Sequence, residues 1–210
     1  MTMLDTPVHA TVDTGLGCVT GSRAHDVIAK TAKKGEPAAS RKNYMADLVI
    51  ERLTGMPING YISAAMQWGL DNEQQARNTY ALTCGDDEVE KPGFIKHPTI
   101  AMSGCTPDGY VGEKGIVSFK CPLTATHLET LDREIIPSPY VTQCQWEMAC
   151  APERPWCDYV SFDPRLPVRM RLHVIRVERD RAFIANLESE VRMFLAELDE
   201  RVAYYQKRYG

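Results

Sequence analysis

The sequence lacks an apolar run long enough to span a membrane. Its first residues, MTMLDTPVHATVDT, also lack the basic segment followed by an apolar one that is typical of a secretory signal. Both absences exclude the common routes into or across a membrane. We therefore expect a protein without membrane segments that resides in the cytoplasm.

The sequence also lacks the cysteine spacing of a disulfide framework or a zinc site. Its seven cysteines are an odd number, and no pair stands as Cys-x-x-Cys. Reduced thiols in a cytosol-like compartment follow from this pattern. We expect these side chains to pack as small apolar groups.

An excess of basic residues is missing as well. The formal net charge is −4, which argues against a protein that coats DNA through its whole surface. The same charge is compatible with an enzyme that collects basic residues in one groove and uses carboxylates to bind a metal. The chain of 210 residues predicts a single domain, 1–210, with an irregular segment at 1–17.

Helical periodicity and capping residues predict most of the helices. A first helix should start after an N-cap at Thr20 or Ser22, and a second runs from a cap at Ser40 to a stop at Gly55. A third should cover 63–82, with Met66, Leu70, Ala76 and Tyr80 on its apolar side and Glu73 at the edge of that side. Further helices are expected at 125–131, at 138–149 (buried against a sheet), and at 180–207 after an N-cap at Asp180.

The segment 103–122, SGCTPDGYVGEKGIVSFKCP, predicts a β-hairpin whose turn contains Gly112 and Gly115. Residues two apart on a strand point to the same face, so Ser118 and Lys120 should lie side by side. Asp108, in the turn Pro-Asp-Gly, can come up beside them. Strands at 156–162 and 169–177 should complete a mixed sheet. The expected fold class is α/β, with a central mixed sheet flanked by helices as in restriction-endonuclease-like nucleases.

An acidic residue beside a strand that presents X-x-Lys is the layout of a metal-dependent phosphodiesterase centre. Phosphodiester hydrolysis adds negative charge to the phosphate oxygens, which a hard divalent cation and an ammonium group stabilise. Ser118 is the anomaly, because a carboxylate is expected there and a hydroxyl is a poor, neutral ligand for Mg²⁺.

The chain resembles the lambda exonuclease family of phage recombination nucleases, the YqaJ-like viral recombinases, a branch of the PD-(D/E)xK nuclease group. The resemblance covers roughly residues 16–177. Its segments occur in the family's order: GCVTGSRAHDVIAK, QWGLDNEQQAR, SGCTPDGY, VSFKCP, PYVTQCQWEM and WCDYVSFDPR. Each is weak alone, but together they form a specific signal.

The resemblance implies roles for individual residues. Lys120 matches the catalytic lysine, Asp108 the metal-binding aspartate, and Glu73 a helix carboxylate near the metals. The main-chain carbonyl of Phe119 matches a metal ligand. Gln143 matches a glutamine near the active site. For DNA binding, the matched or neighbouring positions are Ser22, at the 5′-phosphate, together with Arg23, Tyr140 and Gln145.

The activity implied by the resemblance is a Mg²⁺-dependent 5′→3′ exonuclease, with Mn²⁺ as a substitute metal. It would degrade double-stranded DNA from 5′-phosphorylated ends to mononucleotides, without ATP, for recombination by single-strand annealing. The implied partners are two further copies of the chain, in a homotrimeric toroid, and a single-strand annealing protein. A phage-encoded protein would act in the host cytoplasm.

Two positions depart from the family. Ser118 stands where the family has a metal-binding glutamate, which predicts weakened or absent activity. An engineered change, a natural inactive paralogue, and a substitute acid such as Glu113 remain open explanations, with the third disfavoured because Glu113 lies on the hairpin turn. Gly15 stands where the family has an arginine for the terminal phosphate, and the candidates to replace its charge are Arg23, Lys30, Lys33 and Lys34.

Two other functions remain as alternatives. A chain disabled at Ser118 would serve as a DNA-end-binding module or as a recruiter of the annealing protein. A site-specific endonuclease of the same fold would cut closed circular DNA.

Overall fold

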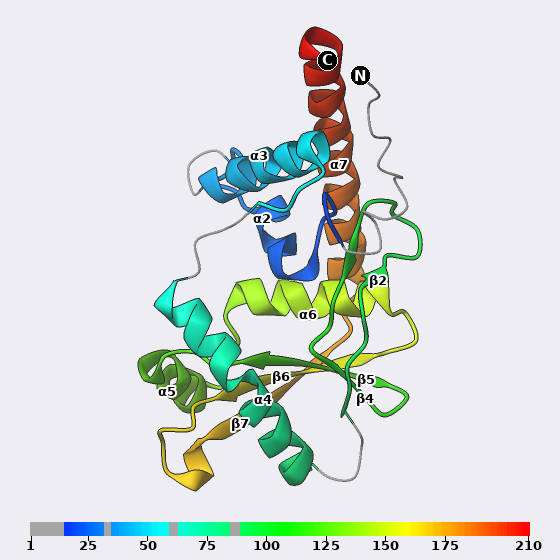
Figure 1. The fold of residues 1–210 in the computed structure, drawn as a ribbon. Coiled ribbons are helices and arrows are strands. Elements are labelled where there is room, and N and C mark those ends of the chain that lie inside the picture. The colour runs from blue at the N-terminus through cyan, green and yellow to red at the C-terminus, as the bar shows by residue number, and fades with distance from the viewer. Residues whose placement is uncertain (1–14, 32–34, 59–62, 85–88) are drawn as a thin grey trace.

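The structure is a computed structural model of the chain, and it describes residues 15–31, 35–58, 63–84 and 89–210. A sheet forms one layer, the helix α6 (Ser138–Cys150) lies over one face of it, and a group of helices lies beyond α6 (Figure 1). Residues 1–14 of the expected irregular segment 1–17, and the candidates Lys33 and Lys34, lie outside the described residues. No helix in the described part of the chain is long and apolar enough to cross a membrane.

The central sheet has five strands in the order β1-β4-β5-β6-β7. Their neighbours are antiparallel except for β5 and β6, which are parallel, so the predicted mixed sheet is confirmed. The predicted hairpin is also confirmed, as the pair β4–β5. The strands are β1 Val89–Glu90, β4 Gly109–Val111, β5 Gly115–Lys120, β6 Trp156–Phe162 and β7 Leu172–Glu178. A separate small ribbon pairs β2 Ile95–Lys96 with β3 Gly104–Cys105.

A parallel pair needs a crossover, and here it contains α5 (Thr124–Arg133) and α6 (Ser138–Cys150). The helix α6 packs against the sheet face that carries Ile116, and every residue from Thr142 to Cys150 is buried. Its sequence, SPYVTQCQWEMAC, contains a single charged residue, Glu147, which is what a helix buried between two layers requires. The prediction of a buried helix here is confirmed.

The opposite face of the sheet is covered by α4 (Ala64–Cys84). Ala76 and Tyr80 pack there against Val117 and Phe119, and the Tyr80 hydroxyl donates to Asp158 Oδ2 at 2.8 Å. The expectation that Met66 and Leu70 are also buried is wrong, since they are 57% and 59% exposed. Burial on α4 is confined to its later turns, where it meets the strands.

The second helical group consists of α2 (Ala24–Ile28), α3 (Ala39–Thr54) and α7 (Arg181–Tyr209), preceded by the 3-10 turn η1 (Gly21–Arg23). Asp180 caps α7 as predicted, because its Oδ1 accepts from the N–H groups of Ala182 and Phe183. Gly55 ends α3 in the left-handed region, at φ 66°. Thr20 occupies the predicted N-cap position, at η1, but its side chain makes no cap hydrogen bond. The predicted caps at Ser22 and Ser40 are wrong, because the N-cap positions of α2 and α3 are Arg23 and Ala38.

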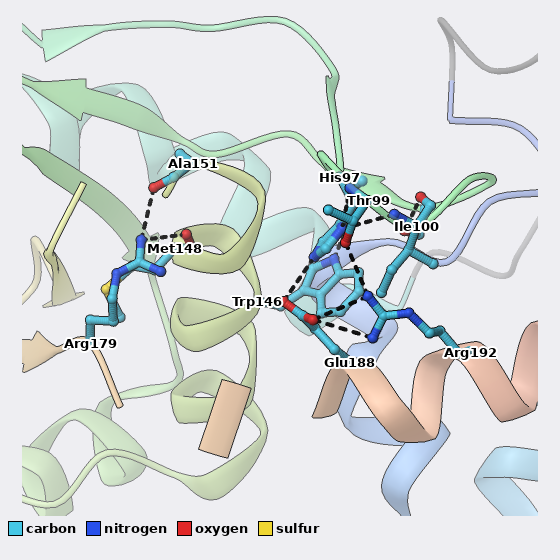
Figure 2. Close-up of polar contacts among 11 residues, drawn as sticks. His97, Thr99, Ile100, Trp146, Met148, Ala151, Arg179, Glu188 and Arg192 are labelled. Atoms are coloured by element: carbon cyan, nitrogen blue, oxygen red, sulfur yellow. Dashed lines mark hydrogen bonds and ion pairs between the residues drawn. The ribbon is translucent and has the colours of Figure 1, made fainter. Parts of the chain in front are cut away.

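The β2–β3 ribbon connects α6 to α7 through His97 (Figure 2). The His97 ring stacks on Trp146 with centroids 5.0 Å apart, and its Nε2 lies 3.5 Å from Glu188 Oε1. Its Nδ1 accepts from the N–H groups of Thr99 and Ile100. Since two donors already point at Nδ1, the neutral ring carries its proton on Nε2 and directs it toward Glu188.

Arg179 holds the C-terminus of α6 (Figure 2). Its Nη2 donates to the carbonyls of Met148, Ala151 and Arg154 at 2.6–2.9 Å. The predicted strand at 169–177 begins later than expected, because Val168–Met170 form the 3-10 turn η2. The C-terminal part of α6 is therefore held from two sides, by His97 through Trp146 and by Arg179 through the last carbonyls of the helix.

Candidate active site

A hollow opens between the C-terminal end of β5, the helix α6 and the turn η1. Its volume is about 350 Å³. Asp108 and Lys120 come from the hairpin, Gln143 and Glu147 from α6, and Ser22 from η1. Residues from three distant parts of the chain therefore meet in one concave, largely polar site. The remaining lining residues are Thr20, Gly21 and Thr106.

Asp108 is held against β5 by the strand itself. The N–H of Phe119 donates to Asp108 Oδ2 at 2.7 Å, and the hydroxyl of Ser118 donates to the same oxygen at 3.4 Å. Arg77 of α4 donates to the main-chain carbonyl of Asp108. These bonds orient the carboxylate toward Lys120, whose Nζ is 3.7 Å away. The predicted proximity of Asp108, Ser118 and Lys120 is thus what the structure shows.

Lys120 remains a cation although it is largely buried. Burial lowers the pKa of Lys120, but the negative charges of Asp108 and then Glu147 oppose this effect, and the pKa ends above its usual value. The ammonium group also lies 5.4 Å from the centroid of the Tyr140 ring, which favours a cation over its face. The site therefore holds a fixed positive charge, which suits stabilisation of a phosphate.

Glu147 was missed by the sequence reasoning. Its side chain is 1% exposed, and its Oε1 accepts from Gln143 Nε2 at 2.7 Å, one helical turn away. Burial raises the pKa of Glu147 to about 8, and the neighbouring charge of Asp108 adds to this. The signal was available in the sequence: a lone acid in an otherwise uncharged, buried helix is costly unless it has a function.

Glu73 lies at a neighbouring hollow rather than in this one. That second hollow is lined by Glu73, Phe119 and Tyr140, and it shares Ser22 and Lys120 with the first. The Glu73 carboxylate is 3.7 Å from Arg77 and 3.9 Å from Lys91, on a side chain 31% exposed. The structure thus places Glu73 in a hollow that adjoins the first one through Lys120.

Two expected DNA-binding residues lie outside both hollows. The Arg23 guanidinium pairs with Asp26 at 2.5 Å and Asp47 at 3.4 Å, so its charge is compensated within the fold. Gln145 is buried, donates to the carbonyl of Glu178 and accepts from the N–H of Asp180, so its amide joins α6 to the start of α7. The predicted contact of Arg23 and Gln145 with DNA stays a prediction.

Gly15 has φ 74°, and a Cβ there would lie 2.9 Å from the Phe94 ring. The position where the family carries a phosphate-binding arginine is thus a tight turn against an aromatic ring. A long side chain does not fit this backbone without rearrangement.

The oxygen donors of the first hollow fit a hard divalent cation. Asp108 and Glu147 offer carboxylate oxygens, which Mg²⁺ prefers, and no sulfur or imidazole ligand is needed. Within the described ranges, no cluster of three or more His, Cys, Asp or Glu side chains is arranged for a metal. Magnesium sites commonly use one or two carboxylates, completed by water, main-chain oxygens and substrate phosphate.

Comparisons with known proteins agree with this geometry. The model of the YqaJ-like viral recombinase domain matches residues 13–154. An alkaline exonuclease (LHK-Exo) from Laribacter hongkongensis is 46% identical, with a TM-score of 0.84 over 92% of this chain and 93% of that one. LHK-Exo in complex with dAMP gives 44% identity and a TM-score of 0.86 over 96% and 97% of the two chains.

A third solved structure shares the fold at lower identity. A phage related exonuclease from Haemophilus somnus 129PT is 16% identical, with a TM-score of 0.70 over 89% of this chain and 96% of that one. A search of curated proteins gave no significant match. The central mixed sheet and its flanking helices are those of exonucleases of the PD-(D/E)xK type.

Proposed function

The chain belongs to the YqaJ-like viral recombinases of the lambda exonuclease family, and from this premise we propose that it is a Mg²⁺-dependent 5′→3′ exonuclease acting on the ends of double-stranded DNA. One observation carries the proposal. Asp108 Oδ2 and Lys120 Nζ lie 3.7 Å apart in a hollow that also contains Ser22. A carboxylate, an ammonium group and a hydroxyl are the groups that hold and polarise a phosphodiester.

The reaction is a hydrolysis. Water attacks the phosphorus between the terminal nucleotide and the next, the bond to the 3′ oxygen of the terminal nucleotide breaks, and that oxygen takes up a proton. The product is a deoxynucleoside monophosphate, the class to which the dAMP of the LHK-Exo complex belongs. The shortened strand keeps a 5′-phosphate, so the reaction can repeat.

Each residue has a separate task in this proposal. Lys120 stabilises the charge that develops on the phosphate oxygens and orients the attacking water, and its position on a central strand limits the motion of its stem. Ser22 donates to the terminal phosphate. Gln143 donates to Glu147 on the same helix, α6, and so positions the Glu147 carboxylate. A divalent cation held by Asp108 and the Phe119 carbonyl, with Glu73 at the edge of the site, would supply Lewis-acid stabilisation and a water of lowered pKa.

The proposal extends to the assembly. The chain acts as one nuclease domain, 1–210, and three copies form a toroid that encloses the duplex, so that processivity follows from topological linkage. A single-strand annealing protein takes over the exposed strand. Mn²⁺ can replace Mg²⁺, since both accept oxygen ligands.

A second candidate function is favoured by Ser118. This side chain is fully buried and donates to Asp108. As a hydroxyl, it supplies no carboxylate at a position where a metal-binding acid is expected. A chain that binds DNA ends or recruits the annealing protein without cutting would need no carboxylate there.

A comparison of two DNA substrates tests both functions. The full chain is incubated with Mg²⁺ and either 5′-phosphorylated linear duplex or closed circular DNA, in parallel with Ser118→Glu and Lys120→Met. The exonuclease releases mononucleotides from linear DNA alone, and Lys120→Met abolishes this. Retained but intact linear DNA in all three reactions supports the binding module. Cleavage of circles indicates an endonuclease instead.

A further inference from the structure

We propose that Glu147 of α6 supplies the carboxylate that the active centre lacks at Ser118, so that the chain keeps two acidic metal ligands, Asp108 and Glu147. The inference rests on the proposed nuclease function and deepens it. In this arrangement the second acidic side chain comes from α6, and not from position 118 on the strand that α6 covers.

The two positions face one another across a single layer boundary. On β5, Ile116, Ser118 and Lys120 alternate with Val117 and Phe119, whose side chains point to α4 on the far side. Ile116 belongs to the core that α6 closes, so Ser118 and Lys120 also point toward α6. Glu147 points back from α6 toward the same strands, since its Oε2 lies 3.9 Å from the Cys157 thiol of β6.

The surroundings of Glu147 are those of a ligand rather than of a structural acid. Its side-chain hydrogen-bond partners are the neutral Gln143 amide and the weakly polar Cys157 thiol. Among the described residues, no ion pair within 4.0 Å involves Glu147. Lys120 attracts the ionised carboxylate of Glu147 in this hollow but forms no ion pair with it within 4.0 Å. Burial of a carboxylate without a direct ion pair is costly, so a fold that keeps one in a polar hollow gains something other than stability.

A serine at position 118 is compatible with an acid at position 147. A serine fits beneath α6 without a charge and donates to Asp108 Oδ2. A glutamate at position 118 would place another carboxylate on this buried face, close to both Asp108 and Glu147, and like charges without a cation repel strongly at low dielectric. A single acidic side chain beside Asp108 is therefore favoured. Metal binding depends on the position of the ligand oxygen, and not on whether its side chain comes from β5 or from α6.

Direct metal titration tests the assignment without relying on catalysis. Mn²⁺ binding to the full chain is measured by calorimetry in the absence of DNA, for the parent protein, Glu147→Gln, Asp108→Asn and the exchange variant with Ser118→Glu and Glu147→Ser. The control is Glu153→Gln, which removes an exposed acid just beyond α6. Melting temperatures in excess chelator show whether each variant is folded.

We expect Glu147→Gln and Asp108→Asn each to weaken Mn²⁺ binding by at least about tenfold, which is ~1.4 kcal/mol. The control should bind like the parent, and the exchange variant should recover most of the lost affinity. If Glu147→Gln fails to fold, Glu147→Asp keeps the charge but withdraws it by one methylene, and a severalfold loss is expected. Parent-like binding by Glu147→Gln or Glu147→Asp, or no Mn²⁺ binding by the parent, overturns the assignment.

The same preparations separate this inference from the nuclease proposal. A parent protein that binds Mn²⁺ through Glu147 but leaves linear DNA intact disproves the nuclease function and keeps the metal site. A parent protein that degrades DNA, with a Glu147→Gln variant that binds metal and degrades DNA equally well, keeps the nuclease function and overturns the role of Glu147.

Discussion

The N–H of Phe119 donates to Asp108 Oδ2 at 2.7 Å, which joins the turn aspartate to the strand that carries the lysine. Because Phe119 directly precedes Lys120 on β5, this bond fixes the carboxylate and the ammonium in one rigid hairpin. The two groups are positioned before any substrate arrives. Such preorganisation reduces the reorganisation that catalysis would otherwise require.

Lys120 should be required for cutting but not for folding. We expect Lys120→Met, which keeps most of the apolar stem, to lower nuclease activity by about 10³-fold, since a preorganised charge at the reacting phosphate is lost. Release of acid-soluble nucleotides from linear duplex measures this. The matched control, Lys114→Met on the exposed hairpin turn, should retain parental activity. Undiminished activity of Lys120→Met would remove the lysine from the mechanism.

Gln145 should matter for stability and not for DNA binding. Replacing it by Ala removes both bonds to the start of α7 and leaves the Asp180 N–H and the Glu178 carbonyl without these partners. We expect a loss of about 1–3 kcal/mol in the free energy of unfolding. Denaturant titration measures it, and fluorescence anisotropy with a labelled DNA duplex should show parental affinity for the folded variant. A weakened affinity without destabilisation would restore Gln145 as a DNA contact.

Gly115 should tolerate no side chain. A Cβ there would approach the Trp156 ring to 2.0 Å, and that ring is in turn stacked under Arg176 at 3.6 Å. We expect Gly115→Ala to destabilise the protein by about 1–3 kcal/mol through overpacking. Gly69→Ala is the matched control, because nothing lies within 4 Å of its Cβ position on α4. That control should stabilise the helix by up to ~1 kcal/mol. Equal melting temperatures for the two variants would contradict the packing described here.

Acidification should weaken the junction between α6 and α7 through His97. Burial lowers the pKa of His97, with Arg192 acting in the same direction and Glu188 opposing it. The unfolded chain therefore binds a proton at a higher pH than the folded chain does. The stability that the neutral ring provides is complete above the ordinary histidine pKa of about 6.5 and is lost as the pH falls through the lower folded value.

The measurement is the free energy of unfolding between about pH 7 and pH 5, for the parent and for His97→Gln. We expect the parent to lose stability more steeply than the variant, whose amide does not titrate. Parallel slopes would show that protonation of His97 is not coupled to folding. Melting in the presence of chelator keeps metal binding out of the comparison.

Some features of the site and the fold can be predicted from short stretches of the sequence. The hairpin and the shared face of Ser118 and Lys120 follow from local rules, because turn residues and the two-residue period of a strand fix them. Asp180 as a cap and Gly55 as a stop are local in the same way, and both predictions are confirmed. Thr20 does take the N-cap position of η1, without a side-chain bond, whereas α2 and α3 start after Arg23 and Ala38 and not after the predicted Ser22 and Ser40.

The sequence by itself determined the hairpin, the buried character of α6 and the pairing of Asp108 with Lys120, since each depends on residues close together along the chain. The mixed sheet was predicted from the order of the elements, but its parallel pair joins β5 to β6 across a long crossover. Only the tertiary structure decided that Glu147 faces that pair, that Gln145 turns away from it, and that Met66 and Leu70 stay exposed. The physical reason is that periodicity gives the apolar side of a helix but not which neighbour it meets. That choice depends on packing between segments far apart in the chain.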